Sequence, residues 1–166
     1  MIHLLLYELK EEIEDYLDNF IEIGDDAVKV VKNIVGQDGK IPDALDDAVL
    51  IVLVDVEREG HPNTKPTEGT PEYVNLFVLF VCNIGTIEEG TLSAQVLSGI
   101  ISFFKNNPTV DVNGKTIRAE MAKLNFDEQN KLWGFLGAKY IPSVLYKFRT
   151  LEVDEDSVDE DINLIG

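Results

Sequence analysis

Few residues in this chain have the chemistry of a metal ligand or a nucleophile. There are two histidines and one cysteine among 166 residues. His3 falls in an amphipathic segment and His61 in a proline-rich one, and neither has a cysteine at the spacing of a zinc site. Cys82 lies in an apolar run without a nearby histidine, which is typical of a small buried hydrophobe rather than of a catalytic thiol. No glycine-rich loop with a lysine indicates a phosphate site.

Carboxylates are plentiful, but their spacing does not suit acid–base catalysis. The adjacent pairs are Asp25-Asp26, Asp46-Asp47 and Glu88-Glu89. Neighbours on a strand point to opposite faces, and neighbours on a helix lie about 100° apart, so these pairs make poor catalytic dyads. The acidic cluster 154–161 resembles a cation site in composition only, because it lacks the glycine and the final bidentate glutamate of a calcium loop. We therefore expect no catalytic residue, no cofactor, no metal ion and no enzymatic activity.

The segment 130–149 is dense in aromatic residues and glycine. Its aromatic residues between 133 and 148 are Trp133, Phe135, Tyr140, Tyr146 and Phe148. One interpretation is the core of a helix–turn–strand unit, in which Gly137 ends the helix and Pro142 starts the strand. That interpretation does not exclude a role for the same residues in an interface.

The strand expected at 144–153 alternates, with Lys147 and Arg149 on the same face as Leu145. A strand of this pattern can add to a partner's sheet or face an acidic surface. The acidic C-terminal segment ends in apolar residues, which could add an edge strand or latch onto a neighbouring subunit or another partner; the alternative is a disordered end that only aids solubility. The candidate interface residues are therefore Trp133, Tyr140, Tyr146, Lys147, Arg149, Ile162, Leu164 and Ile165.

The elements that must position these residues follow from hydrophobic periodicity. Apolar residues three and four apart predict helices over 2–20, 87–106 and 125–136. Apolar and β-branched runs predict strands at 27–35, 47–57, 73–83, 116–124 and 144–153. This order indicates an α+β fold: a mixed, mainly antiparallel sheet of about five strands flanked by three helices. The polar loop 58–72 is long for a compact domain, which is typical of a functional segment.

Length and charge set the domain organisation and exclude some partners. We expect a single domain over residues 1–153 and an acidic tail over 154–166. The net charge is −17, with nine acids and one lysine in residues 1–26 and seven acids and no base in 150–166. Such a charge repels nucleic acid and anionic membrane surfaces. No apolar run approaches the roughly 20 residues of a membrane-spanning helix, and no basic leader precedes the first acids, so we expect a cytoplasmic protein.

The residues around Trp133 resemble those of one protein family. The matching positions are Leu132-Trp133, Leu136-Gly137, Lys139-Tyr140, Pro142-Ser143, Tyr146 and Arg149. The pattern is similar to the end of the N-terminal domain in Pvc-type tail terminators, or caps, of phage-tail-like contractile injection systems. The similarity extends over about residues 2–153. The resemblance implies a sheet with flanking helices, as in other tail terminators.

The function implied by the resemblance is structural. Such caps form rings, usually hexamers, that close the distal end of the inner tube, join it to the last sheath ring and fix the tail length. The implied partners are other copies of the chain and the inner-tube and sheath proteins of the same particle, with no nucleic acid and no membrane insertion.

Two other kinds of function remain open. An assembly adaptor or chaperone would bind tail subunits in the cytoplasm and leave the finished particle. A small ligand-binding module or enzyme would need a polar pocket with a perturbed titratable group, for which the sequence offers no candidate.

Overall fold

Six strands form one curled sheet at the centre of the fold. The computed structural model describes residues 1–60, 71–86 and 88–153. Its elements are α1 (Ile2–Asp18), β1 (Val28–Val30), the 3-10 turn η1 (Asp43–Leu45), β2 (Ala48–Arg58), β3 (Glu72–Asn83), α2 (Gly90–Asn106), β4 (Thr109–Val112), β5 (Lys115–Met121), α3 (Phe126–Leu136) and β6 (Ser143–Val153). The strands lie in the order β1-β2-β3-β6-β5-β4; β1 and β2 are parallel and the other described pairs are antiparallel. The predicted α+β fold with a mixed, mainly antiparallel sheet is therefore confirmed.

The sheet has one strand more than the five or so that the sequence predicts. The added strand is β4, which forms a hairpin with β5 around Asn113-Gly114. Both turn residues have positive φ, 53° and 77°, as a two-residue hairpin turn requires. The sequence marks the turn clearly, but β4 buries only Val110 and Val112. Two apolar side chains are too few to display the alternation of a strand.

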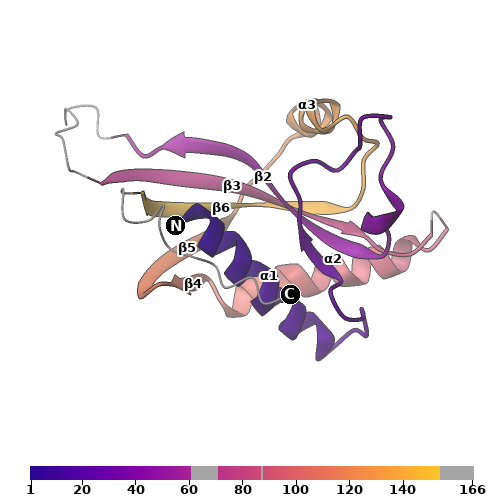
Figure 1. The fold of residues 1–166 in the computed structure, drawn as a ribbon, viewed down its shortest axis with the longest axis horizontal. Helices are drawn as coiled ribbons and strands as arrows, with labels where there is room; N and C mark the ends of the chain where they lie inside the picture. The colour runs from indigo at the N-terminus through magenta and orange to yellow at the C-terminus, as the bar shows by residue number, and fades with distance from the viewer. Residues whose placement is uncertain (61–70, 87, 154–166) are drawn as a thin grey trace.

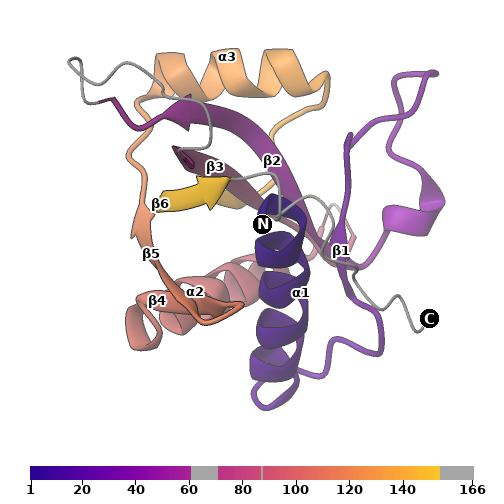
Figure 2. The same ribbon diagram turned by 60° about the vertical axis from the view of Figure 1, so that its left-hand side comes forward.

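One face of the sheet is covered by α1 and α2, as Figures 1 and 2 show. The inward stripe of α1 consists of four fully buried residues: Leu5, Leu9, Ile13 and Leu17. Helix α1 contacts both outer strands, β1 and β4, so the curled sheet partly encloses it. Where α1 meets α2, a Cβ atom on Gly99 would lie 2.7 Å from Cδ2 of Leu17. Glycine at this position lets the two helices approach closely.

The core of this covered face is strongly aromatic. Phe80, Phe104, Tyr146 and Phe148 form four ring pairs with centroid distances of 4.1–5.9 Å. They come from β3, α2 and β6, so one cluster joins the central strands to a helix. Edge-to-face and tilted ring contacts of this kind add to the stabilisation from burial alone.

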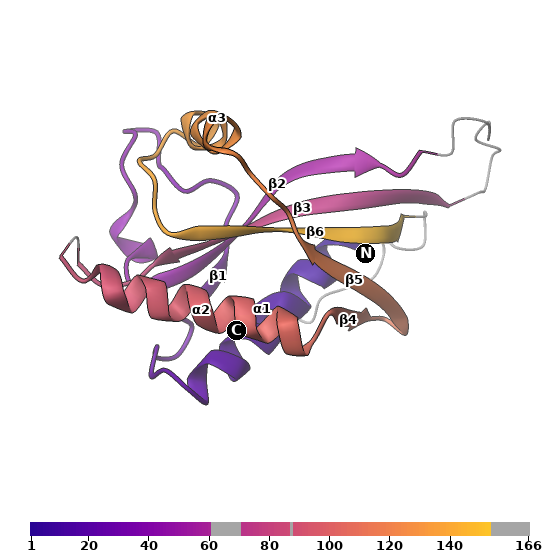
Figure 3. The same ribbon diagram turned by 180° about the vertical axis from the view of Figure 1, so that it is seen from behind.

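The opposite face is covered only in part, by α3 and the coil that follows β1 (Figure 3). Helix α3 begins at a capping box between Asn125 and Glu128 and ends at Gly137, whose φ of 72° is left-handed, as the sequence predicts. Strand β1 is shorter than the predicted 27–35, because the chain leaves the sheet after Val30 and buries Ile34 against the opposite face.

Two predicted features lie largely outside the described residues. Of the loop 58–72, only the ends are described, and there Arg58 and Glu72 form an ion pair. The acidic tail 154–166, including Ile162, Leu164 and Ile165, is not described either. Residue 87, where the second helix was expected to begin, is also outside the described ranges, and α2 begins at Gly90.

Candidate functional site

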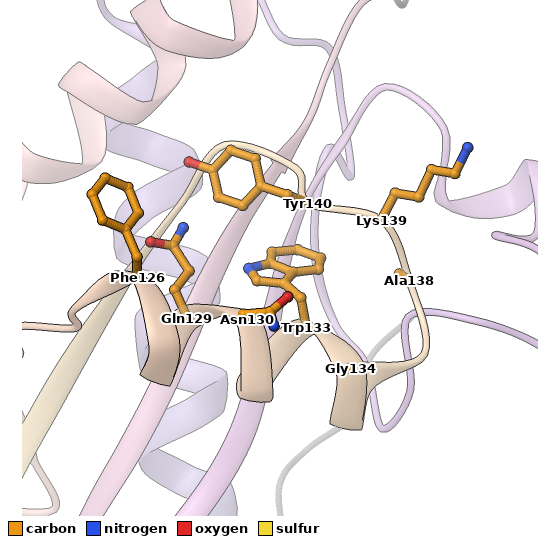
Figure 4. Close-up of a pocket in the computed structure, with 8 residues that line it drawn as sticks. All are labelled: Phe126, Gln129, Asn130, Trp133, Gly134, Ala138, Lys139 and Tyr140. Atoms are coloured by element: carbon orange, nitrogen blue, oxygen red, sulfur yellow. The ribbon is translucent and has the colours of Figure 1, made fainter.

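The surface of α3 and the turn after it form an open groove with aromatic walls (Figure 4). Its volume is about 660 Å³, and its lining residues are Phe126, Gln129, Asn130, Trp133, Gly134, Ala138, Lys139 and Tyr140. Phe126 is 93% exposed and Tyr140 is 56% exposed. Phe135, elsewhere on the same short helix, is 81% exposed. Large aromatic side chains gathered in contact with water are typical of a surface that another protein covers.

Trp133 forms the floor of this groove and fixes α3 to the sheet. Its side chain is 5% exposed and belongs to the core cluster on this face of the sheet. The indole packs edge-on against Tyr140, with 5.6 Å between ring centroids and 73° between ring planes. The structure therefore places Trp133 in the core, as one of the two sequence interpretations expects, and brings it together with Tyr140.

The indole nitrogen of Trp133 is a polar atom in an apolar place. Nε1 is buried and has no hydrogen-bond acceptor among the described residues. A buried N–H without an acceptor costs about 1–3 kcal/mol. The core beneath α3 therefore carries a local energetic cost at this atom.

Tyr146 lies on the other face of the sheet, away from Trp133. It is 3% exposed and packs against Phe80 and Phe104 in the aromatic core. Burial raises the pKa of its phenol above the usual value. The inclusion of Tyr146 among surface contacts is thus corrected: alternation along β6 turns it into the core.

Lys147 and Arg149 do share the face that α3 covers only in part, but acids of the same chain surround them. Lys147 Nζ lies 3.1 Å from Glu57 Oε2 and 5.4 Å from the centre of the Phe77 ring. Arg149 places Nη1 3.4 Å from Glu120 Oε2 and Nη2 3.5 Å from Glu59 Oε1. Glu120 and Glu59 raise the pKa of Arg149. The acidic side chains that face these two cations therefore belong to the same chain: Glu57 on β2, Glu59 just after β2, and Glu120 on β5.

The sequence analysis leaves two possibilities for the strand carrying Lys147, addition to a partner's sheet or contact with an acidic surface, and strand pairing bears on the first. Strand β6 pairs with β3 along almost its whole length and with β5 over residues 146–149. Both of its edges are occupied there, so it cannot accept another strand. The sequence pattern shows which face a side chain takes, but it does not show whether a strand is central or at an edge.

The described residues contain little that suits catalysis. Among them, no group of three or more histidine, cysteine, aspartate or glutamate side chains could hold a metal ion. Cys82 is fully buried, as expected, and burial raises the pKa of its thiol to about 12, so it is not a thiolate at neutral pH. No helix in the described ranges is long and apolar enough to cross a membrane.

Two of the adjacent acidic pairs come together at one end of the sheet. Asp46, Asp47, Glu88 and Glu89 line the same depression. Two of the four carboxylates brace the loop before α2: Asp47 accepts a hydrogen bond from the Gly85 N–H at 3.0 Å, and Glu89 accepts one from the Thr86 N–H at 3.1 Å. Asp47 and Glu89 therefore have a local structural role.

The sequence interpretation misses Phe126 and Phe135 as candidate surface residues. Phe135 lies off the inward stripe of α3, which runs through Leu132, Trp133 and Leu136, and a helical projection of 126–136 would have shown this. Phe126 lies seven residues before Trp133, so it projects beside the stripe, and its exposure at the first position of the helix could not be read from the projection.

Comparisons with known proteins agree with this fold. One solved structure is a sheath/tube terminator, in the extended state, of the extracellular contractile injection system PVC: the TM-score is 0.56 and the identity 13%, over 90% of this chain and 57% of that one. Another is the tube-terminating cap of the anti-feeding prophage: the TM-score is 0.53 and the identity 15%, over 87% of this chain and 55% of that one. The chain thus spans little more than half the length of these structures.

The family assignment comes from a sequence model. No curated protein matches the chain. The model of one family, however, matches residues 6–165, which is nearly the whole sequence and includes the acidic tail. This match is in accord with the resemblance seen around Trp133. The chain belongs to the family described as the Pvc16 N-terminal domain.

Proposed function

We propose that this chain is a structural tail terminator, or cap, of a contractile injection system. The observation that carries the proposal is the family match over residues 6–165, together with a fold shared with two tube-terminating proteins. In this role the chain forms a ring, a hexamer in our proposal, that closes the inner tube, joins it to the last sheath ring and fixes the tail length. It assembles in the cytoplasm and stays at the distal end of the particle.

The structure offers this role a rigid body with one surface suited to contacts. A cap has no reaction to catalyse, so it needs complementary surfaces and a scaffold that keeps its shape. The aromatic groove at α3 is our candidate for contact with a neighbouring subunit or with the tube, because Phe126 is almost fully exposed there and Tyr140 is more than half exposed. Trp133 and Tyr140 shape the groove, and the ion pairs of Lys147 and Arg149 order the sheet surface next to it.

The proposal is tested by removing the protein from the system that produces the particles. Without it, we expect inner tubes and sheaths of irregular length, or none that remain extended, and expression of the intact chain should restore a uniform length. Length distributions measured by electron microscopy provide the readout. Uniform, extended particles in the absence of the protein would overturn the proposal.

A second measurement separates a cap from an assembly adaptor. Mass spectrometry of purified particles should find the chain in a fixed ratio to the tube protein, and class averages of the distal end should show a ring. An adaptor would be absent from finished particles. If the chain were absent, the proposed function would change from cap to assembly adaptor.

A contact variant then tests the groove itself. Phe126→Ser should leave the fold intact, because this side chain is exposed, and should weaken ring formation. Val56→Ser, which alters an exposed residue on β2 away from α3, is the matched control. An unchanged ring in the Phe126→Ser variant would remove the groove from the proposal.

A further inference from the structure

A second groove lies on the other side of the molecule, between the first half of α1 and strand β1. Its volume is about 530 Å³, and its walls include the side chains of Leu6, Tyr7, Val30 and Val31. Val30 is 42% exposed although it lies in a strand. Figure 2 shows β1 running beside α1, and β1 is an end strand of the described sheet. The groove is thus a mainly apolar channel along a sheet edge.

The backbone along this edge offers hydrogen-bonding groups. Strand β1 faces β2 through alternate residues, since the Ala27 carbonyl accepts from Val49 N at 2.7 Å and Val31 N donates to the Ile51 carbonyl at 3.0 Å. The alternate residue Val30 therefore directs its N–H and C=O away from the sheet. An exposed edge of this kind accepts an added strand.

The protein has covered one part of the edge already. The N–H of Val28 donates to Oε2 of Glu14 on α1, at 3.1 Å. No such partner is present for Val30 among the described residues. The open stretch of the edge is therefore short and lies directly beside the apolar walls of the groove.

The described chain ends close to this groove. Val153, at the end of β6, packs against the core cluster that contains Met1, and Ile2 packs against the same cluster. Figure 1 shows the end of β6 next to the N-terminus of α1. The eight residues 154–161 that precede Ile162 can span up to about 28 Å when extended, whereas the whole of α1 is about 25 Å long. The C-terminal segment thus starts beside the helix that lines the groove and is long enough to reach it.

The sequence of that segment suits the groove. Ile162 and Leu164 are two residues apart, so in a strand their side chains take the same face. The remaining lining residues are His3, Lys10, Asp26 and Lys29, and both lysines pair with Asp26 at 3.4 Å, so the fit rests on the apolar residues and not on charge. The family model continues through residue 165, so these apolar positions belong to the region that the family model covers.

We propose that residues 162–165 of the chain's own C-terminal segment dock along the free edge of β1, with Ile162 and Leu164 in the groove against α1. The added backbone satisfies Val30, and the apolar side chains cover Tyr7 and Val30. The segment then ties the first helix and the outermost strand of the same subunit together. This inference concerns the single chain and does not depend on the proposed function.

Amide exchange on the full-length chain tests the docking. In the intact protein the Val30 amide should be protected, and the double variant Ile162→Ser, Leu164→Ser should speed its exchange by about tenfold or more. Val158→Ser, an apolar-to-polar change in the same segment but outside 162–165, should leave it unchanged. Amides of β3 serve as an internal reference that the fold is intact. Equal exchange at Val30 in all three proteins would overturn the proposal.

Disulfide trapping identifies whose segment occupies the groove. A chain carrying Tyr7→Cys and Leu164→Cys should form a disulfide within one chain under mild oxidation, visible as a faster monomer band on a non-reducing gel. Cys82 is fully buried and does not compete. A covalent dimer would show that a second copy supplies the segment, and no cross-link would show that the groove is occupied by neither; each result would overturn docking within the subunit.

Discussion

The two faces of the sheet are built from the same strands but are filled differently. On the face covered by α1 and α2, buried residues run from β1 to β4 without interruption and include the aromatic cluster around Phe104. On the other face, α3 and the coil after β1 cover a smaller cluster around Trp133. Beyond that cluster, the face consists of ion pairs such as Lys147–Glu57.

Strand β2 shows the change within one element. Its first five residues are all buried, because both faces are covered there, whereas its last four are exposed. The pattern along a strand therefore reports where its covering elements end. In this molecule the fully covered face provides stability, and the half-covered face leaves side chains available for contacts.

The largest effect should come from the fully covered face. Phe148 on β6 is completely buried within the aromatic cluster. Phe148→Ala should lower the free energy of unfolding by about 3–5 kcal/mol, because it removes buried apolar surface and leaves a cavity. Urea unfolding followed by circular dichroism measures this change. If Phe148→Ala lowered the free energy of unfolding by less than Trp133→Ala does, the face covered by α3 would contribute more to stability than the face covered by α1 and α2.

Trp133→Ala should also lower the free energy of unfolding, but by about 1–3 kcal/mol less than the truncation of a buried aromatic residue without an unsatisfied N–H, such as Phe148. The reason is that the substitution also removes the buried Nε1, which has no acceptor among the described residues. Trp133→Phe is the informative control, since it keeps a ring and removes only the N–H and part of the volume. If Trp133→Phe destabilised the chain as much as Trp133→Ala, the N–H would have an acceptor and the explanation would fail.

The sequence predicts the covered parts of the fold well and the half-covered surface poorly. The stripe of Leu5 to Leu17, the apolar runs of the central strands and the turn at Asn113-Gly114 are local patterns, and each corresponds to an observed element. The position of β6 in the sheet depends on partners distant in sequence, so its lack of a free edge could not be derived. For the same reason, the acids around Lys147 and Arg149 are visible only in the fold.

The ion pairs on the half-covered face should contribute far less than the core. A double-mutant cycle with Lys147→Met and Glu57→Gln should give a coupling of about 0.2–1 kcal/mol, because Glu57 is half exposed and water screens the pair. The coupling should shrink when the salt concentration is raised. A coupling well above this range that is insensitive to salt would mean that this face is better enclosed than its exposure indicates.

The smallest effect tests an unfavourable charge next to the covered face, the carboxylate of Glu12. Burial, followed by repulsion from Glu8 and Asp111, raises the pKa of Glu12 above its ordinary value of 4.5. The folded chain therefore holds this proton more tightly than the unfolded chain does. As the pH rises from 4.5 through the raised pKa, the unfolded state loses its proton first, so stability decreases with pH across this window and the penalty is complete above it. Glu12→Gln should accordingly be slightly more stable than the original chain at neutral pH, and this gain should vanish below pH 4.5. Thermal unfolding at several pH values measures the difference.

Glu11→Gln is the matched control, because the Glu11 carboxylate lies 3.6 Å from Lys10 and its loss should bring no gain in stability. A gain for Glu12→Gln that persisted unchanged at low pH would show that packing, and not charge, limits stability where α1 meets β4.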